Sequence, residues 1–188
     1  LMPDSFAPAT GRRDRVLVTH YANPPHLIPL VEVVPASATS DAALQAACSL
    51  LERAGKRPIV VRRQVPGFVL NRLQFALLRE ALWLVENGVA APRDVDYALS
   101  NSIGRRWSTA GIFEVFELAG WDLVAAIAGH LLPHLAAGPE VPALLRDKVA
   151  RGELGAKTGR GFYQWTPESA EELRRRIAAA LVEIEKWR

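Results

Sequence analysis

The sequence predicts a mainly α-helical protein that begins with a short α/β segment. Two observations predict this fold class: short β-branched runs occur before residue 64, and only helical apolar spacing follows. The 188 residues are 49% hydrophobic and 23% charged, a balance that excludes a disordered chain. We therefore expect an α/β domain remnant over 1–64 and an all-α domain over 65–188.

The first segment is expected to hold three strands and one helix. Alternating and β-branched residues predict strands at 15–21, 30–34 and 57–63. A helix is expected between 41 and 54, because stretch 37–41 offers N-cap residues and Gly55 suits the C′ position. Three strands are few for an independent sheet domain. The chain opens on Leu1-Met2-Pro3 with no expected strand or helix, which indicates that its beginning is cut.

Each element expected after residue 65 is a helix. We expect helices at 66–87, 92–101, 111–119, 121–136, 140–151 and 167–187. The first carries apolar residues on all sides, so we expect it to be buried centrally. Pro92 and Pro167 suit the first position of a helix, and Thr166 suits the N-cap before the last one.

Charge and hydropathy bound the class of protein. The formal net charge is only +3, and the clustered arginines lack the aromatic or recognition-helix pattern of nucleic-acid binders. Solvated faces are expected, with a basic rim around an anionic ligand such as a CoA ester as the alternative. The apolar stretch 123–135 is too short to span a bilayer. Cys48, the single cysteine, is expected in the core of a reduced, cytoplasmic protein.

A histidine and a glutamate form the first candidate site. His20 ends the first expected strand, directly before a turn enforced by Asn23-Pro24-Pro25. If the first two strands pair antiparallel, Glu32 reaches the imidazole, orients it and stabilises its protonated form. The alternative is that His20 is a hydrogen-bonded surface residue.

Three further features have a functional and a structural interpretation. Asn71 is unfavourable inside a helix, so it either bonds locally or points its amide into a site. Lys157 lies in the glycine-rich stretch 155–165, which matches neither a Walker A nor a dinucleotide motif and alone is a surface turn. His130 and His134 have the i, i+4 spacing of metal ligands, but Pro133 interrupts them and no metal site is expected.

Four motifs occur in one order along the chain. They are HYANPP at 20–25 with PLVEV at 29–33, VPGFVLNRL at 65–73, GVAAPRDVD at 88–96 and KTGRGFY at 157–163. In order and spacing this set resembles the 3-hydroxyacyl-CoA dehydrogenase family over essentially the whole chain. The resemblance implies a helical C-terminal domain of the 6-phosphogluconate-dehydrogenase-like type, preceded by the last strands of an incomplete Rossmann domain.

The resemblance also implies an activity, the NAD-dependent oxidation of a 3-hydroxyacyl-CoA to the 3-ketoacyl-CoA, as in fatty-acid β-oxidation. His20 would take the 3-hydroxyl proton, Glu32 would hold the imidazole, and Asn71 would hydrogen-bond near the substrate oxygen. Asn23 and Lys157 would lie near the cofactor. The helical domain would form a homodimer.

The chain departs from the family pattern at the cofactor site. The Gly-rich turn that seats a pyrophosphate on a helix N-terminus is missing from these residues. We therefore expect this chain to be inactive by itself and to need the remainder of the NAD-binding domain for hydride transfer.

The substrate class is a second departure. SIGRRW at 102–107, followed by GIFE at 111–114, is more similar to the branch of lambda-crystallin and L-gulonate 3-dehydrogenase, which acts on small free hydroxy acids. Arg105 or Arg106 would then pair with a substrate carboxylate, or both are solvated helix-end charges. A non-catalytic helical dimerisation module is the alternative to an enzyme. An arginine-rich nucleic-acid binder is disfavoured by the modest net charge.

Overall fold

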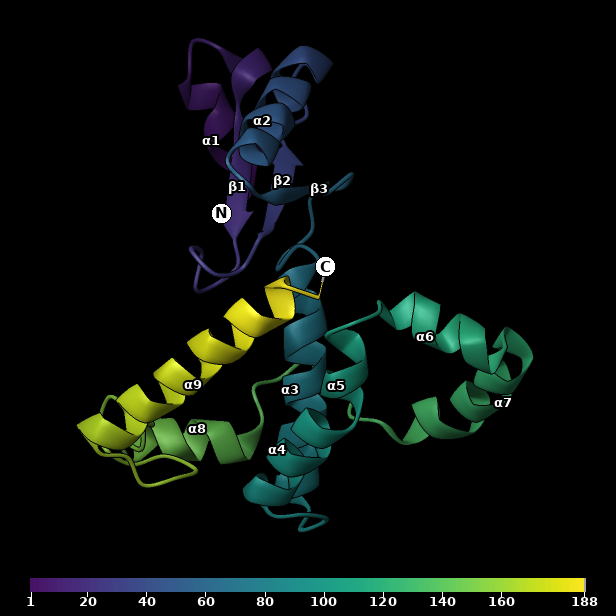
Figure 1. The fold of residues 1–188 in the computed structure, drawn as a ribbon, viewed down its shortest axis with the longest axis vertical. Coiled ribbons are helices and arrows are strands. Elements are labelled where there is room, and N and C mark those ends of the chain that lie inside the picture. Colours follow the sequence, from purple (N-terminus) through teal and green to yellow (C-terminus); the bar gives the residue numbers. More distant parts are fainter. Residues whose placement is uncertain (188) are drawn as a thin grey trace. The chain divides into compact units, whose positions relative to one another are not determined.

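The chain consists of two units, seen in a computed structural model that describes residues 1–187 (Figure 1). The units are Leu1–Phe75 and Ala76–Arg188. The boundary between them falls inside one long helix, α3 (Leu70–Glu86).

The first unit is a small sheet with one long helix and several short helical turns. Its elements before α3 are α1 (Pro3–Phe6), the 3-10 turns Ala7–Ala9 and Arg13–Arg15, β1 (Leu17–Tyr21), β2 (Leu30–Pro35), α2 (Asp41–Arg53) and β3 (Arg57–Val60). The three strands and α2 are confirmed, although β3 is shorter than expected. The expectation of no helix at the start was wrong, because Pro3 suits the first position of a helix and begins α1.

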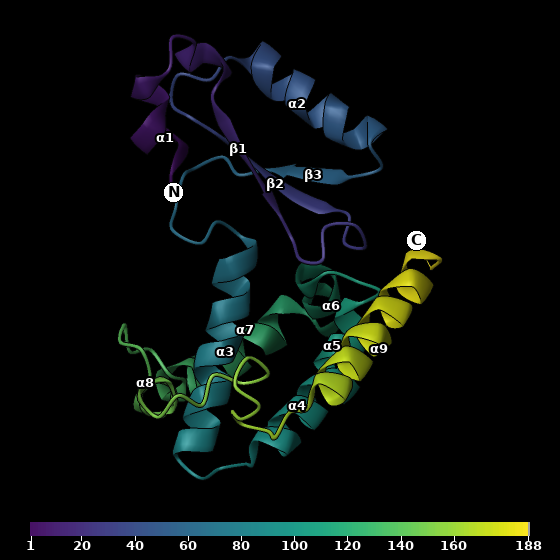
Figure 2. The same cartoon turned by 90° about the vertical axis from the view of Figure 1, so that its left-hand side faces the viewer.

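The sheet has the strand order β1-β2-β3, with β2 antiparallel to β1 and parallel to β3. Successive side chains of a strand point to opposite faces. On one face of β2, Val31 and Val33 pack with Leu51 of α2, which lies along the sheet in Figure 2. On the other face, Val34 packs with residues that follow β3. Glu32 shares the face of Val34.

The ends of α2 follow the sequence prediction. The side chain of Ser40 accepts a hydrogen bond from the N–H of Ala43, and Gly55 follows the C-cap with a φ of 76°. Cys48 is half-buried on the inner side of this helix, and burial raises the pKa of its thiol. The capping residues thus set the two ends of α2, and its inner side packs on the sheet.

The second unit is built from helices. After α3 come α4 (Pro92–Asn101), α5 (Ile103–Trp107), α6 (Ile112–Ala119), α7 (Trp121–Leu131), the 3-10 turn Leu132–His134, α8 (Ala143–Ala150) and α9 (Pro167–Glu185). Pro92 and Pro167 begin their helices as predicted, and Thr166 caps α9 by accepting the N–H of Ser169. The sequence did not predict α5, which is only five residues long and contains Gly104, a poor helix former.

Helix α3 differs from its prediction in two ways. It begins at Leu70 and not at 66, because Gly67 and Phe68 adopt φ values of 82° and 48° that no α-helix accommodates. The expected central burial was wrong: Leu82 is buried, but Phe75 is 61% exposed. Apolar residues surround the helix, and the described chain does not cover all of them.

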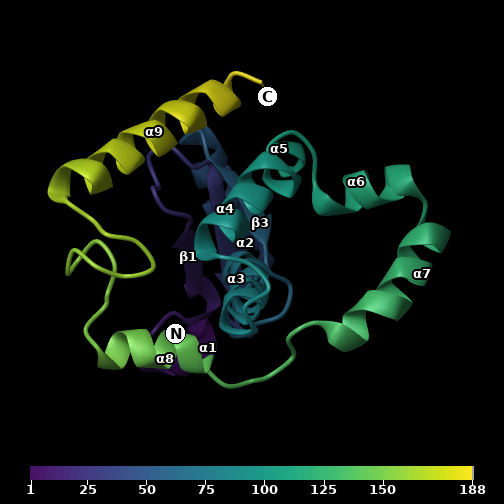
Figure 3. The same cartoon turned by 90° about the horizontal axis from the view of Figure 1, so that it is seen from below.

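Helices α6 and α7 form a bent pair that lies apart from α8 and α9 in Figure 3. Gly120, with a φ of 89°, occupies the bend of 105° between them. Among residues 1–187 no single helix has the length and apolarity to cross a bilayer, and only this bent pair reaches them when its two segments are taken together.

Candidate active site

The antiparallel pairing of β1 and β2 brings the two predicted catalytic side chains together. His20 lies directly opposite Glu32 in the ladder, and its Nδ1 lies 2.6 Å from Glu32 Oε2. A carboxylate only accepts hydrogen bonds, so Nδ1 carries the proton and Nε2 stays available. The His20 side chain remains 30% exposed, whereas that of Glu32 is fully buried. An accessible imidazole is thus held by a buried carboxylate.

The second carboxylate oxygen of Glu32 binds the start of α3. Glu32 Oε1 accepts the backbone N–H groups of Val69 at 2.7 Å and Leu70 at 2.9 Å. These donors would otherwise be unsatisfied at a helix N-terminus, where the positive end of the helix dipole favours an anion. One buried carboxylate therefore joins the imidazole to the first turn of α3.

The turn between β1 and β2 is held in place by hydrogen bonds of its own and by a lysine that follows α2. The Asn23–Pro24 peptide bond is cis, and the carbonyl of Pro24 accepts the N–H groups of Leu27 and Ile28. Lys56 Nζ, just after α2, donates to the carbonyl of Ile28 at 3.3 Å. Asn23 itself is exposed beside the strand that carries His20.

Asn71 lies in the first turn of α3, one residue after a donor to Glu32. It is half-buried, and within the described residues no hydrogen bond joins its amide to His20 or Glu32. The structure therefore puts Asn71 on the helix end that Glu32 holds, and leaves its predicted contact with a substrate oxygen as a prediction.

The remaining predicted site residues belong to the second unit. Lys157, Arg105 and Arg106 are all exposed there, and Arg105 Nη2 donates to Asn101 Oδ1 at 3.3 Å. Their proposed contacts with cofactor and substrate stay predictions.

The glycine-rich loop that contains Lys157 is more than the simple surface turn expected from its sequence. Glu153 accepts from Lys148 at 2.9 Å and pairs with Arg151 and Arg160. The hydrogen bonds from Lys148 and Arg151 lower the pKa of Glu153 to about 2. Lys148 Nζ also lies 4.5 Å from the centre of the Phe162 ring, a cation–π contact.

The same loop is fixed to α4 by a tyrosine. Tyr163 Oη donates to Asp96 Oδ2 at 2.7 Å, and burial together with this carboxylate raises the pKa of Tyr163 to about 12. Sequence reasoning missed this contact, because only the fold brings residue 163 beside residue 96. It also missed the Lys148–Glu153 pair, although these residues are close in the sequence.

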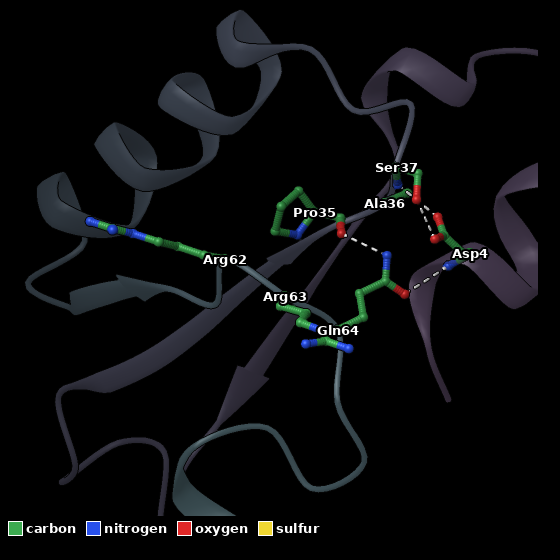
Figure 4. Close-up of a pocket in the computed structure, with 7 residues that line it drawn as sticks. All are labelled: Asp4, Pro35, Ala36, Ser37, Arg62, Arg63 and Gln64. Carbon is green, nitrogen blue, oxygen red and sulfur yellow. Dashed lines mark hydrogen bonds between the residues drawn. The ribbon is translucent and has the colours of Figure 1, made fainter.

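A cavity of about 350 Å³ lies at the carboxyl ends of β2 and β3 (Figure 4). Its polar groups bind one another: Asp4 accepts from the N–H and hydroxyl of Ser37, and Gln64 bridges Asp4 N–H and the carbonyl of Pro35. Hydrogen bonds from Ser37 lower the pKa of Asp4. Arg62 points away from this network in Figure 4. The polar side chains of the cavity are thus explained by the hydrogen bonds that they make within the first unit.

Metal ligation receives no support from the geometry. His130 and His134 contact each other with ring centroids 5.9 Å apart. Across residues 1–187, no group of three or more histidine, cysteine, aspartate or glutamate side chains is arranged to hold a metal ion.

Two family models of known proteins match this chain. Residues 1–65 match the family model of the 3-hydroxyacyl-CoA dehydrogenase NAD-binding domain, and residues 67–165 match that of its C-terminal domain. The chain therefore belongs to the 3-hydroxyacyl-CoA dehydrogenase family, whose members are NAD-dependent oxidoreductases.

Two curated relatives show what this chain is similar to. It is 34% identical over 173 residues to 5-formyl-3-hydroxy-2-methylpyridine 4-carboxylate 5-dehydrogenase of Mesorhizobium japonicum, covering 92% of this chain and 56% of the relative. It is 45% identical over 172 residues to L-carnitine dehydrogenase of Pseudomonas aeruginosa, covering 87% of this chain and 53% of the relative. The chain thus spans about half the length of these relatives.

Solved structures agree with this relationship. A crystal structure of a 5-formyl-3-hydroxy-2-methylpyridine 4-carboxylic acid 5-dehydrogenase, described as an NAD⁺-dependent dismutase, superposes with a TM-score of 0.95 at 32% identity, covering 99% of this chain and 60% of that one. The (S)-3-hydroxybutyryl-CoA dehydrogenase of Ralstonia eutropha gives a TM-score of 0.65 at 32% identity, covering 88% of this chain and 58% of that one.

Proposed function

We propose that this chain carries the catalytic base of an NAD-dependent dehydrogenase that oxidises a hydroxyl group to a carbonyl. The observation that carries the proposal is the contact of His20 Nδ1 with the buried Glu32, which leaves Nε2 for a substrate. Burying a carboxylate is costly unless it has hydrogen-bond partners, and the imidazole of His20 is one of these partners. A surface histidine that contacts only solvent would not be paired with a fully buried carboxylate.

The imidazole provides general base catalysis in this proposal. His20 Nε2 takes the proton of the substrate hydroxyl as the carbonyl forms, and returns it in the reverse direction. Glu32 fixes the tautomer and stabilises the positive charge that the ring acquires. Asn71, at the start of α3, donates a hydrogen bond from its amide to the substrate oxygen.

The residues present fit one side of an NAD site. An accessible base suits a hydride-transfer centre, and exposed Asn23 and Lys157 are our candidates for contacts with the cofactor. The Gly-rich turn that seats the pyrophosphate is not among these 188 residues, so full binding requires further residues of the NAD-binding domain. NAD, when bound, would supply the hydride acceptor for the carbon that bears the hydroxyl.

Two substrate classes have support. Both curated relatives described above are named for small carboxylates, L-carnitine and a pyridine carboxylate, which favours a free hydroxy acid. Exposed Arg105 or Arg106 would then pair with the carboxylate. The similarity to a 3-hydroxybutyryl-CoA dehydrogenase supports a 3-hydroxyacyl-CoA and a role in fatty-acid metabolism as the second candidate.

Homodimerisation through the helical unit is part of the proposal. Large apolar side chains of α6 and α7 are exposed, among them Phe113 at 73% and Leu118 at 89%. Exposed apolar side chains of this size support an interaction site. The same observation supports the non-catalytic alternative, a dimerisation module, so only an activity measurement separates the two.

Turnover of the full-length gene product that contains this chain tests the proposal. NADH oxidation is followed with a small free 3-keto acid and with acetoacetyl-CoA, beside a His20→Gln variant and a His26→Gln control. We expect the His20 variant to lose about 10²–10⁴-fold in kcat, as removal of a general base does, and the control to be unaffected. Equal rates in wild type and His20→Gln contradict the role of His20. No turnover of either substrate favours the dimerisation module.

A further inference from the structure

Phe68 has a backbone conformation that L-amino acids rarely adopt. Its φ is 48°, and within residues 1–187 it is the only non-glycine residue with a positive φ. Such a conformation persists only where the surroundings enforce it, and it concentrates at functional sites. Gly67 before it also has a positive φ, of 82°. The left-handed turn at 67–68 is therefore held by its contacts and not by the preference of phenylalanine.

This turn aims two backbone donors at the catalytic carboxylate. The N–H groups of Val69 and Leu70, the next two residues, donate to Glu32 Oε1 at 2.7 and 2.9 Å. Phe68 itself donates its N–H to the carbonyl of Val65 at 3.1 Å, which closes the turn. The backbone of Phe68 thus sets the direction of the donors that fix Glu32.

The side chain of Phe68 reaches the other catalytic residue. It is buried to 8% exposure and packs with Val34 and Val61. Its ring centre lies 5.6 Å from that of His20, with the two ring planes at 63°. This T-shaped arrangement is one of the two geometries that aromatic pairs favour. The imidazole therefore has a carboxylate at Nδ1 and a phenyl ring beside it, and both depend on residue 68.

We propose that Phe68 is a positioning residue for His20. Its aromatic ring restricts rotation of the imidazole about the Cβ–Cγ bond, and its left-handed backbone holds Glu32, so that Nε2 points in one direction. An aliphatic side chain fills the same space but offers no edge-to-face contact. The consequence for catalysis rests on the proposed function, whereas the effect on the orientation of the imidazole does not.

Imidazole NMR of the 188-residue chain tests the proposal without turnover. The readout is the Nδ1 proton of His20 and its rate of exchange with water. Phe68→Leu keeps apolar bulk, Phe68→Gly removes the ring but suits a positive φ, and Phe68→Tyr keeps the ring. Phe75→Leu, at a 61% exposed position of the same unit, is the matched control. We expect Phe68→Leu and Phe68→Gly to raise the exchange rate about 3- to 10-fold, the range that an aromatic pair implies.

We expect Phe68→Tyr and the Phe75 control to keep the wild-type exchange rate. The proposal is overturned if Phe68→Leu keeps that rate, or if Phe68→Tyr raises it as much as Phe68→Leu does. Backbone amide spectra check the fold of each variant, and Phe68→Leu against Phe68→Tyr decides the question if Phe68→Gly does not fold. In the full-length protein, Phe68→Leu is expected to lower kcat with KM unchanged. Full turnover by His20→Gln would overturn the proposed function and leave the NMR comparison intact.

Discussion

At the scale of single residues, Glu32 is the group on which both the site and the fold depend. It is the one charged residue that is fully buried among those described, and its two oxygens take three hydrogen bonds, from an imidazole and two backbone N–H groups. Removing one partner of a buried hydrogen bond lowers the free energy of unfolding by more than the intact bond contributes to it, because the other partner is left unsatisfied. Substitution at this position therefore affects stability as well as catalysis.

We predict that Glu32→Gln lowers the free energy of unfolding by about 1–3 kcal/mol, the cost of mismatched buried hydrogen bonds. The amide presents an N–H group where an oxygen now accepts a bond. Urea unfolding measures the change, and Glu52→Gln on the exposed side of α2 is the control with the same chemical change. Identical midpoints for wild type and Glu32→Gln would contradict the prediction.

Arg79 shows the opposite situation, a buried polar atom without a partner. Its Nε is buried on α3 and makes no hydrogen bond within the described chain. We predict that Arg79→Met, whose side chain reaches as far as the position of Nε, raises the free energy of unfolding by about 1 kcal/mol, because an unsatisfied buried donor is removed. Thermal unfolding measures it against Arg93→Met, at an exposed position of α4. A lower melting temperature for Arg79→Met would show that the guanidinium has a partner in solution.

The sequence predicted part of the site at this scale. The contact of His20 with Glu32 was expected from strand spacing on the condition that the first two strands pair antiparallel, and they do. The catalytic roles of both residues came from the resemblance and stay predictions. The backbone donors at Val69 and Leu70 were not predicted, because nearly every residue has a main-chain N–H group and the residue type does not show which of these groups will bind a side chain. The ring contact of Phe68 was missed for a related reason: the contact depends on a left-handed turn that sequence rules assign to glycine.

At the scale of elements, the loop after α8 is held by charge. Glu153 has a pKa of about 2, lowered from its ordinary value of 4.5 by hydrogen bonds from Lys148 and Arg151. A carboxylate whose pKa is lowered in the folded state stabilises the folded state at pH values above the ordinary pKa. This contribution is lost as the pH falls from about 4.5 toward 2.

We predict that Lys148→Met raises the pKa of Glu153 toward its ordinary value and reduces the loss of stability over this acid range. Carbon-13 NMR titration of the Glu153 carboxylate measures the pKa directly. Lys186→Met, next to the exposed Glu183, is the control that removes an equivalent charge from a solvated pair. An unchanged pKa for Glu153 in Lys148→Met would show that the arginines alone hold the carboxylate.

Element boundaries were predicted well where capping residues mark them. Gly55 ends α2, and Thr166 with Pro167 begins α9, as expected. The start of α3 was misplaced, because the cap of that helix is Glu32, a residue of another element. The sequence around the start of α3 cannot predict a capping residue that lies 37 residues away.

At the scale of the whole molecule, the chain exposes more surface than its length requires. Its accessible surface is 13398 Å², whereas two separate compact domains of these lengths would expose about 10,700 Å² together. The excess includes apolar side chains of α6 and α7 that water would not normally surround. We propose that a second copy of the chain covers them.

We predict that Leu118→Glu weakens self-association about tenfold or more, because it places a charge among the exposed apolar side chains of α6 and α7. Sedimentation velocity over a range of concentrations measures the dissociation constant. Leu50→Glu, at a 59% exposed position of α2, is the matched control. A monomeric wild-type protein at all concentrations would contradict the prediction of a homodimer.

The change from an α/β segment to helices was predicted from periodicity alone, because strands and helices bury apolar residues at different intervals. The exposure of α3 was not predicted. Apolar residues on all sides of a helix indicate that the helix is buried, but they do not indicate whether the same chain or another chain covers it.

The double role of Glu32 has a consequence for descent. In a lineage that no longer needed catalysis, Glu32 would still be retained by selection for a folded protein, because it caps α3. The imidazole of His20 is partly exposed and caps no helix, so it would be free to drift. The two residues would thus be lost at different times, and a relative that keeps the glutamate without the histidine would mark a fold whose chemistry has ended.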